Sequence, residues 1–184
     1  MRTEKKTQRV AFLGIMGALA LVLGFIENML IPDIPFLPVG AKPGLSNVVT
    51  MYVVSLAGLG GGIYITLIKA VFALITRGVT ASAMSLCGGL LSTLATALLI
   101  KKKDKLFSFV GIGIVGALMH NLGQLSAACF ISGTPALFGY GKYLMIFALI
   151  TGAVTGSMLL FIMPGIDRIN NKNNMRKQDK EMKA

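Results

Sequence analysis

A few charged and amide side chains interrupt the long apolar stretches of this sequence. They are Glu27, Asn28, Lys42, Asn47, Lys69, Arg77, His120, Asn121 and Gln124. A charge at the centre of a membrane-spanning helix costs about 2.5–3.5 kcal/mol unless it faces a partner or a cavity. We therefore expect these residues to share one polar interior. Because cations outnumber anions in the set, this interior suits an anionic or amide-rich small molecule.

Two pairs in this set have helical spacing. Lys69 and Arg77 are eight residues apart, which places Lys69 about 12 Å deeper in a helix and about 80° around it. His120 and Gln124 are four residues apart and share a helix face. An alternative in which these residues have structural roles, and bind no ligand, stays open. In it, Arg77 reaches lipid headgroups and Lys69 pairs with Glu27.

The residues that enzymes and metal sites require are missing from the sequence. No Gly-x-x-x-x-Gly-Lys-[Ser/Thr] run is present, so the chain has no nucleotide-binding P-loop. The acidic residues form no Asp-rich motif that could hold the Mg²⁺ needed for prenyl transfer. His120 is the single histidine, and Cys87 and Cys129 form no Cys-x-x-Cys pair. We expect no catalytic residue, no metal site and no enzyme activity.

Composition indicates a membrane protein. Of the 184 residues, 54% are hydrophobic and only 14% are charged, against about 25% charged in soluble proteins. The net charge of +11 would otherwise favour a nucleic-acid partner, but most basic residues lie at the ends of apolar segments. That placement follows the positive-inside rule, so we expect membrane lipids around the chain and no nucleic acid.

Six apolar stretches are candidate membrane spans. They are Val10–Ile31, Leu45–Leu59, Ile63–Arg77, Ala81–Ile100, Phe107–Ile131 and Leu137–Met163. The second and third are short for a span of about 20 residues, and glycines between positions 58 and 62 separate them. One kinked span over both stretches is the competing interpretation.

Charge favours six crossings. With a cytoplasmic N-terminus, the basic run Lys101–Lys105 is cytoplasmic only if an even number of spans precedes it. The fold class predicted is an all-α integral membrane six-helix bundle with both termini in the cytoplasm. Residues 1–166 would form one six-span domain and residues 167–184 a basic cytoplasmic tail. We expect a multi-pass protein of the bacterial plasma membrane.

Two further segments suggest roles. The proline-rich stretch Pro32–Gly44 has little helical propensity, and its position fits a lid over the polar interior. Gly14 and Ala18 form a small-residue surface of the kind that lets membrane helices pack closely. Packing within the chain is the more common explanation of any one such surface, but its place beside the basic N-terminus favours a partner membrane protein that docks there.

Three stretches resemble a known family. Lys42-Pro-Gly-Leu-Ser-Asn47, Ser85-Leu-Cys-Gly-Gly-Leu-Leu-Ser92 and Gly116-Ala-Leu-Met-His-Asn-Leu-Gly-Gln-Leu125 are similar to the family known as Gx transporters or heptaprenyl diphosphate synthase component I. The likeness covers about residues 10–163. More broadly, the chain resembles the substrate-binding S components of energy-coupling factor (ECF) vitamin transporters.

The resemblance implies a mechanism and partners. In S components a vitamin- or cofactor-like ligand binds near the outer side, and helix one packs on a transmembrane T component that works with two cytosolic ATPases. Carried over, Gly14 and Ala18 would dock the partner, and the polar set would bind the ligand. Two alternatives remain. One is a flavin- or quinone-binding protein of extracellular electron transfer with membrane redox partners, and the other is a non-catalytic accessory subunit of heptaprenyl diphosphate synthase.

Overall fold

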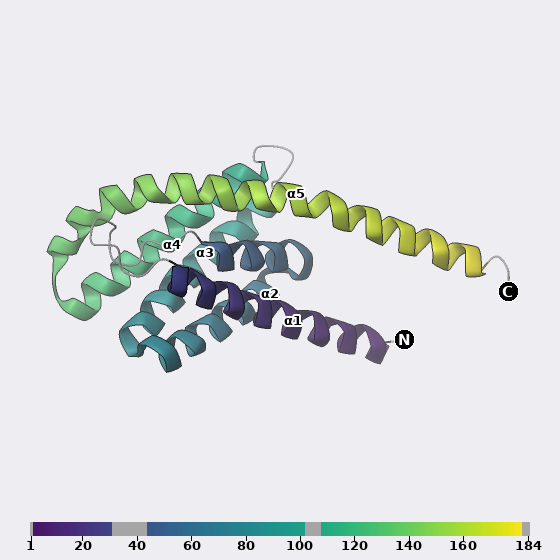
Figure 1. Cartoon of the computed structure of the whole chain (residues 1–184), viewed down its shortest axis with the longest axis horizontal. Coiled ribbons are helices and arrows are strands. Elements are labelled where there is room, and N and C mark those ends of the chain that lie inside the picture. Colours follow the sequence, from purple (N-terminus) through teal and green to yellow (C-terminus); the bar gives the residue numbers. More distant parts are fainter. Residues whose placement is uncertain (1, 31–43, 102–107, 182–184) are drawn as a thin grey trace.

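The computed structural model describes the backbone of residues 2–30, 44–101 and 108–181, and the side chains of 6–29, 44–101 and 108–163. Helix is the only regular secondary structure within these ranges (Figure 1). The elements are α1 (Arg2–Leu30), α2 (Leu45–Arg77), α3 (Val79–Ile100), α4 (Phe109–Ser132), the short 3₁₀ helix η1 (Pro135–Tyr140) and α5 (Gly141–Glu181). The all-α class expected from the sequence is confirmed.

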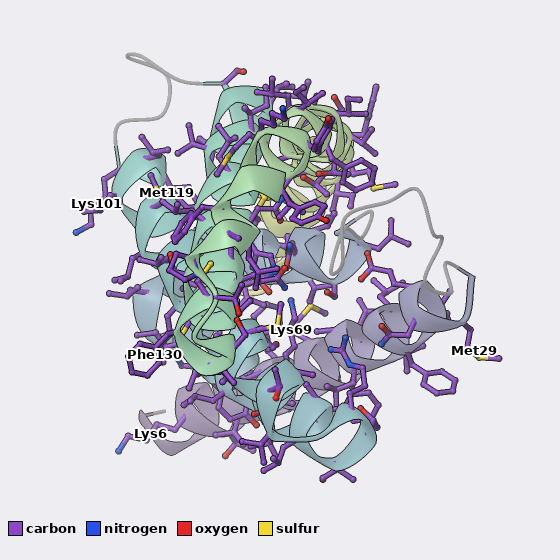
Figure 2. The ribbon with its side chains drawn as sticks, turned by 90° about the vertical axis from the view of Figure 1, so that its left-hand side faces the viewer. Lys6, Met29, Lys69, Lys101, Met119 and Phe130 are labelled. Atoms are coloured by element: carbon purple, nitrogen blue, oxygen red, sulfur yellow. The ribbon has the colours of Figure 1, made fainter. Side chains whose placement is uncertain are left out.

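The outer surface of this bundle is apolar. Five of the described helices are long and apolar enough to cross a membrane. Large hydrophobic side chains point outward, including Phe130, which is 90% exposed, and Phe161, which is 82% exposed. Figure 2 shows Phe130 at the periphery and Lys69 in the middle of the bundle. Apolar side chains outside and a lysine inside are the arrangement of a multi-pass membrane protein.

The second helix folds back on itself at Gly58. The backbone of Gly58 has φ 73° and ψ −170°, a conformation that is essentially restricted to glycine. Lys69 Nζ donates a hydrogen bond of 2.8 Å to Asn47 Oδ1, 22 residues earlier. In a straight helix these residues would be about 33 Å apart. The two halves of α2 therefore lie side by side.

This fold-back bears on the expected number of helices. The stretches Leu45–Leu59 and Ile63–Arg77 follow one another within α2, with the reversal at Gly58 near the end of the first. In the described part of the chain five helices are long and apolar enough to cross a membrane, so the expected count of six is not confirmed. The physical reason is that a single glycine reverses the chain, and helical structure resumes directly after it.

The first helix contacts both ends of the first half of α2. Arg9 Nη2 donates to the carbonyl oxygen of Ala57 at 3.3 Å, next to the bend. At the other end, Glu27 contacts the start of α2. The half of α2 that ends at the bend is thus antiparallel to α1. The N-terminal end of α1 and the C-terminal end of α5 point the same way from the bundle (Figure 1).

Backbones approach most closely between α4 and α5. A Cβ built on Gly113 would lie 2.4 Å from the carbonyl oxygen of Gly152, and one on Gly156 would lie 2.5 Å from that of Phe109. Any side chain at these glycines would push the two helices apart. Glycine therefore allows α4 and α5 to pack backbone against backbone.

Candidate ligand-binding site

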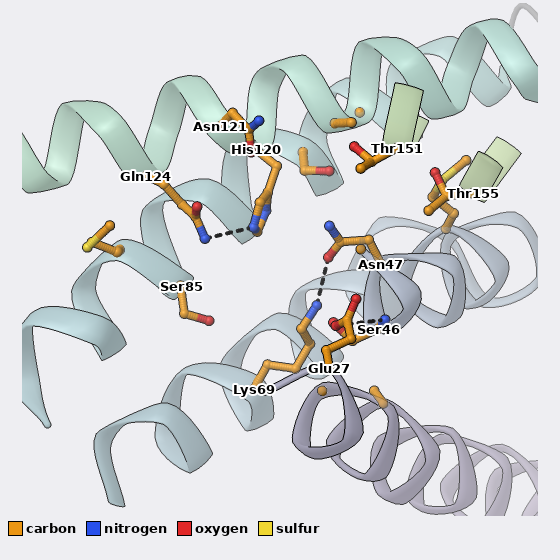
Figure 3. A pocket seen from close by; sticks show the side chains of 18 of the residues that line it. Glu27, Ser46, Asn47, Lys69, Ser85, His120, Asn121, Gln124, Thr151 and Thr155 are labelled. Atoms are coloured by element: carbon orange, nitrogen blue, oxygen red, sulfur yellow. Dashed lines mark hydrogen bonds between the residues drawn. The ribbon is translucent and has the colours of Figure 1, made fainter. Parts of the chain in front are cut away.

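A cavity of about 440 Å³ opens between the five long helices. Residues Ala20 to Asn28 of α1 form one wall, both halves of α2 form the next, and α3, α4 and α5 complete it. Figure 3 shows the polar side chains that converge on this space from different helices. Its volume is in the range of small-molecule sites in proteins.

The structure brings together nearly all of the polar residues singled out in the sequence. Those that line the cavity are Glu27, Asn28, Asn47, Lys69, Arg77, His120, Asn121 and Gln124. Lys42 lies outside the described residues, as does the expected lid, apart from Gly44, which lines the cavity. Residues from three helices, α1, α2 and α4, thus share one interior.

Glu27 caps the start of α2 from the neighbouring helix. Its side chain is 3% exposed, and its carboxylate oxygens accept hydrogen bonds from the backbone N–H groups of Leu45 and, at 3.4 Å, Ser46. The N-cap residue Gly44 has no side chain with which to cap these groups. The first N–H groups of a helix need an acceptor, and the positive end of the helix dipole favours an anion there.

Lys69 is the innermost cation of the cavity. It belongs to the second half of α2, and its ammonium group donates to the amide oxygen of Asn47 in the first half. Within the described residues this neutral amide is its one hydrogen-bond acceptor. In the alternative interpretation Lys69 pairs with Glu27. The structure gives Lys69 the Asn47 amide as its hydrogen-bond acceptor and leaves the nearby Glu27 carboxylate bonded to the backbone of α2.

The α4 wall carries a histidine–glutamine pair. His120 Nε2 and Gln124 Nε2 are 3.0 Å apart, as their spacing of four residues predicts. A Cβ on Gly88 of α3 would lie 2.7 Å from both the backbone oxygen of His120 and Cγ of Gln124. The absence of a side chain at Gly88 therefore allows α3 to pack closely against this turn of α4. This close packing holds the His120–Gln124 pair in its orientation.

Asn121 lines the cavity and also bonds to the neighbouring helix. Its Nδ2 donates a hydrogen bond of 2.9 Å to the backbone oxygen of Leu144, and the side chain is 8% exposed. The amide nitrogen thus links α4 to α5, and the amide oxygen and the second N–H remain for a ligand. Arg77 lies at the opposite extreme, exposed at the end of α2.

Hydroxyl groups complete the lining, and the sequence did not single them out. They are Ser46, Ser85, Ser92, Thr151 and Thr155. Serine and threonine occur in membrane helices with their hydroxyls bonded to a preceding carbonyl, as Thr155 bonds to the backbone oxygen of Gly152 at 3.1 Å. Their presence alone therefore does not distinguish a site. The position of Ser85 and Ser92 in a stretch shared with a known family was the available signal.

The expected docking residues lie away from the cavity. Gly14 and Ala18 are exposed on α1, and a Cβ built on Gly14 would meet no atom within 4 Å. Packing within the described part of the chain therefore does not account for the small residue at Gly14.

The chemistry of the site is recognition by hydrogen bonds and charge. Among the described residues, no group of three or more His, Cys, Asp or Glu side chains is arranged to hold a metal ion. The cavity contains cationic, amide, imidazole and hydroxyl groups on an otherwise apolar wall. Such a wall orients a small molecule through a few polar contacts.

Comparison with known proteins places the chain in a family. No curated protein and no solved structure matches it. The family described as heptaprenyl diphosphate synthase component I matches residues 16–162, a range that includes α2, α3 and α4 whole, parts of α1 and α5, and every described residue of the polar set. This protein therefore belongs to the heptaprenyl diphosphate synthase component I family.

Proposed function

We propose that this protein captures a vitamin- or cofactor-like small molecule in an outward-facing membrane cavity for uptake, in the manner of an ECF S component. The observation that carries the proposal is the cavity of about 440 Å³ with Lys69, Asn47 and the His120–Gln124 pair on facing walls. Polar groups in a membrane interior are costly unless they serve a site. The site residues are the polar set that lines this cavity, together with Lys42.

The topology proposed for this role has six crossings and both termini in the cytoplasm. The fold-back at Gly58 supports it, since each half of α2 then crosses once. The contact of Arg9 with Ala57 supports it too, because it puts the bend beside the basic N-terminal end of α1. Under this topology Arg77, Asn28 and Gln124 mark the outer mouth of the cavity.

Uptake requires an energy source that the sequence does not supply, so we propose partners. The exposed small-residue surface at Gly14 and Ala18 fits a T component that works with cytosolic ATPases. Gly14→Leu should leave the protein folded, because nothing packs on this position, and should reduce co-purification of partner proteins. The matched control is Val71→Phe, a change on the 56% exposed Val71 of α2.

The test of the proposed function is to identify the ligand. The protein is purified from native membranes in mild detergent, and small molecules released by denaturation are identified by mass spectrometry. The expected result is a stoichiometric vitamin- or cofactor-like compound whose cellular uptake falls when the protein is deleted. A normal uptake rate in the deletion strain would contradict the proposal. Recovery of a bound flavin or quinone with unchanged uptake would instead favour an electron-transfer role with membrane redox partners.

A second function is favoured by the family itself. The family's description names a component of heptaprenyl diphosphate synthase, so a non-catalytic accessory subunit that binds the catalytic component is the alternative. Deletion of the protein should then shorten the side chain of the cellular quinone or lower its amount. Chromatography of extracted quinones measures this, and an unchanged side-chain length would remove the alternative.

A further inference from the structure

We infer that the cavity selects ligands bearing an anionic group, a carboxylate or a phosphate, and that Lys69 seats this group. The inference deepens the proposed function and rests on it only in treating the cavity as a ligand site. It concerns the sign of the charge that the cavity accepts, which can be measured without knowing the ligand or the partners.

The first observation is the environment of Lys69. Figures 2 and 3 show it in the middle of the bundle, pointing into the space lined by the other polar side chains. Within the described residues its one hydrogen-bond acceptor is the neutral Asn47 amide, so two of its three N–H donors have no protein acceptor. The Glu27 carboxylate is close enough to act on this ammonium group through its charge, but it accepts no hydrogen bond from Lys69 in the described part of the chain. An anionic group of a ligand can therefore bond to the N–H donors that remain.

The second observation is that the carboxylate in the cavity is already occupied. Both oxygens of Glu27 accept backbone N–H groups at the start of α2. The helix dipole there partly offsets its negative charge. Glu27 is the one carboxylate among the described lining residues, and Lys69 and Arg77 are cations, so the lining keeps a net positive charge.

The third observation is the distribution of groups along the cavity. Arg77 adds a second cation at the mouth, whereas the deeper wall is formed by small residues such as Ala20, Gly113, Gly116 and Ala117. The lining thus combines two cations at different positions along α2 with small apolar residues. This combination fits a small molecule with an anionic group and a compact, largely apolar body.

The experiment measures the charge preference with thiol reagents. Ser85 is replaced by cysteine in a background with Cys87→Ala and Cys129→Ala, because Ser85 and Lys69 line the same small recess beside the main cavity. The purified protein in detergent is treated with either anionic sulfonatoethyl methanethiosulfonate or cationic trimethylammonioethyl methanethiosulfonate. Each rate is divided by the rate at Thr134→Cys, an exposed position outside the cavity, to remove the intrinsic difference between the reagents.

The normalised rate should favour the anionic reagent by about tenfold, which corresponds to about 1.4 kcal/mol. Lys69→Met should abolish the preference and Lys69→Arg should retain it. If Lys69→Met fails to fold, Gln124→Glu is used instead. This change puts a carboxylate on the facing wall and should reverse the preference for the anionic reagent.

Three outcomes would overturn the inference. They are equal normalised rates with Lys69 intact, a preference for the cationic reagent, and a Ser85→Cys protein that reacts with neither reagent. The uptake assay in the deletion strain is independent of these rates. A failure of charge selection is therefore distinguishable from a failure of the proposed function.

Discussion

The Glu27 carboxylate occupies a position that a capping side chain usually fills. Helix α2 begins after a glycine, and the acceptor for its first N–H groups comes from another helix. The residue that caps this helix end therefore also links α1 to α2, in addition to the Arg9 contact and the apolar packing of Ala20 on Val49 and Val53. Its neighbour in the cavity, Asn47, is placed by the same first turn of α2 and in turn contacts Lys69.

Removal of the Glu27 side chain should destabilise the protein. Glu27→Ala leaves buried N–H groups of Leu45 and Ser46 without their acceptor, which costs about 1–3 kcal/mol. Glu27→Gln keeps an acceptor oxygen and should lose less. The midpoint of thermal unfolding in detergent measures both effects. The control is Met29→Ala, at a side chain that is 68% exposed, and an equal midpoint for Glu27→Ala and this control would contradict the role given to Glu27.

Two cavity residues should separate binding from stability. Arg77 is exposed at the mouth, so Arg77→Ala should lower the amount of co-purified ligand with little change in the unfolding midpoint. Asn121 donates to Leu144 between two helices, so Asn121→Ala should lower the midpoint by the equivalent of about 1–3 kcal/mol. Mass spectrometry of the ligand and thermal unfolding are measured on the same preparations. A lower unfolding midpoint for Arg77→Ala together with an unchanged midpoint for Asn121→Ala would contradict these roles.

At the scale of elements, α2 decides how the cavity is built. Because it reverses at Gly58, one helix supplies two adjacent walls, and Asn47 and Lys69 meet across them. A straight helix would place these residues about 33 Å apart. The bend thus brings two polar residues that are far apart in the sequence into one site.

A substitution at the bend should therefore be costly for conformational reasons alone. Gly58 and Gly60 both have open space where a Cβ would be, but only Gly58 has a positive φ. Gly58→Ala should cost about 1–3 kcal/mol of stability and weaken ligand retention. Gly60→Ala is the matched control and should be neutral or slightly stabilising, since alanine favours helix. Equal unfolding midpoints for the two variants would contradict the conformational explanation.

Much of the element pattern could be predicted from the sequence, and the reasons are physical. Apolar runs of span length predict membrane helices, and ionisable residues such as Lys69 and His120 within them predict an interior site. The sequence did not predict that Glu27 would bond to backbone rather than to Lys69. A buried carboxylate needs hydrogen-bond donors, and backbone N–H groups or an ammonium group can supply them. It also did not distinguish Ser85 and Thr155 from other hydroxyl residues, since only tertiary packing turns them toward the cavity.

At the scale of the whole molecule, the proposed topology can be tested directly. Six crossings place residue 101 inside the cell and residue 134 outside, and they return the C-terminus to the cytoplasm. If α2 crossed only once, all three positions would be reversed. A membrane-impermeant maleimide should label Thr134→Cys in intact cells and Lys101→Cys only after the cells are opened, in a background with Cys87→Ala and Cys129→Ala. Labelling of Lys101→Cys in intact cells would contradict six crossings.

The glycine contact between α4 and α5 has a mechanical consequence. At Gly113, Gly152 and Gly156 the two backbones touch without intervening side chains, so one helix has no room to slide or rotate without carrying the other. We therefore expect α4 and α5 to move together. The contact between α1 and the first half of α2 is of another kind, since it combines hydrogen bonds at Glu27 and Arg9 with apolar packing of Ala20 against Val49 and Val53. Side chains can repack where touching backbones cannot.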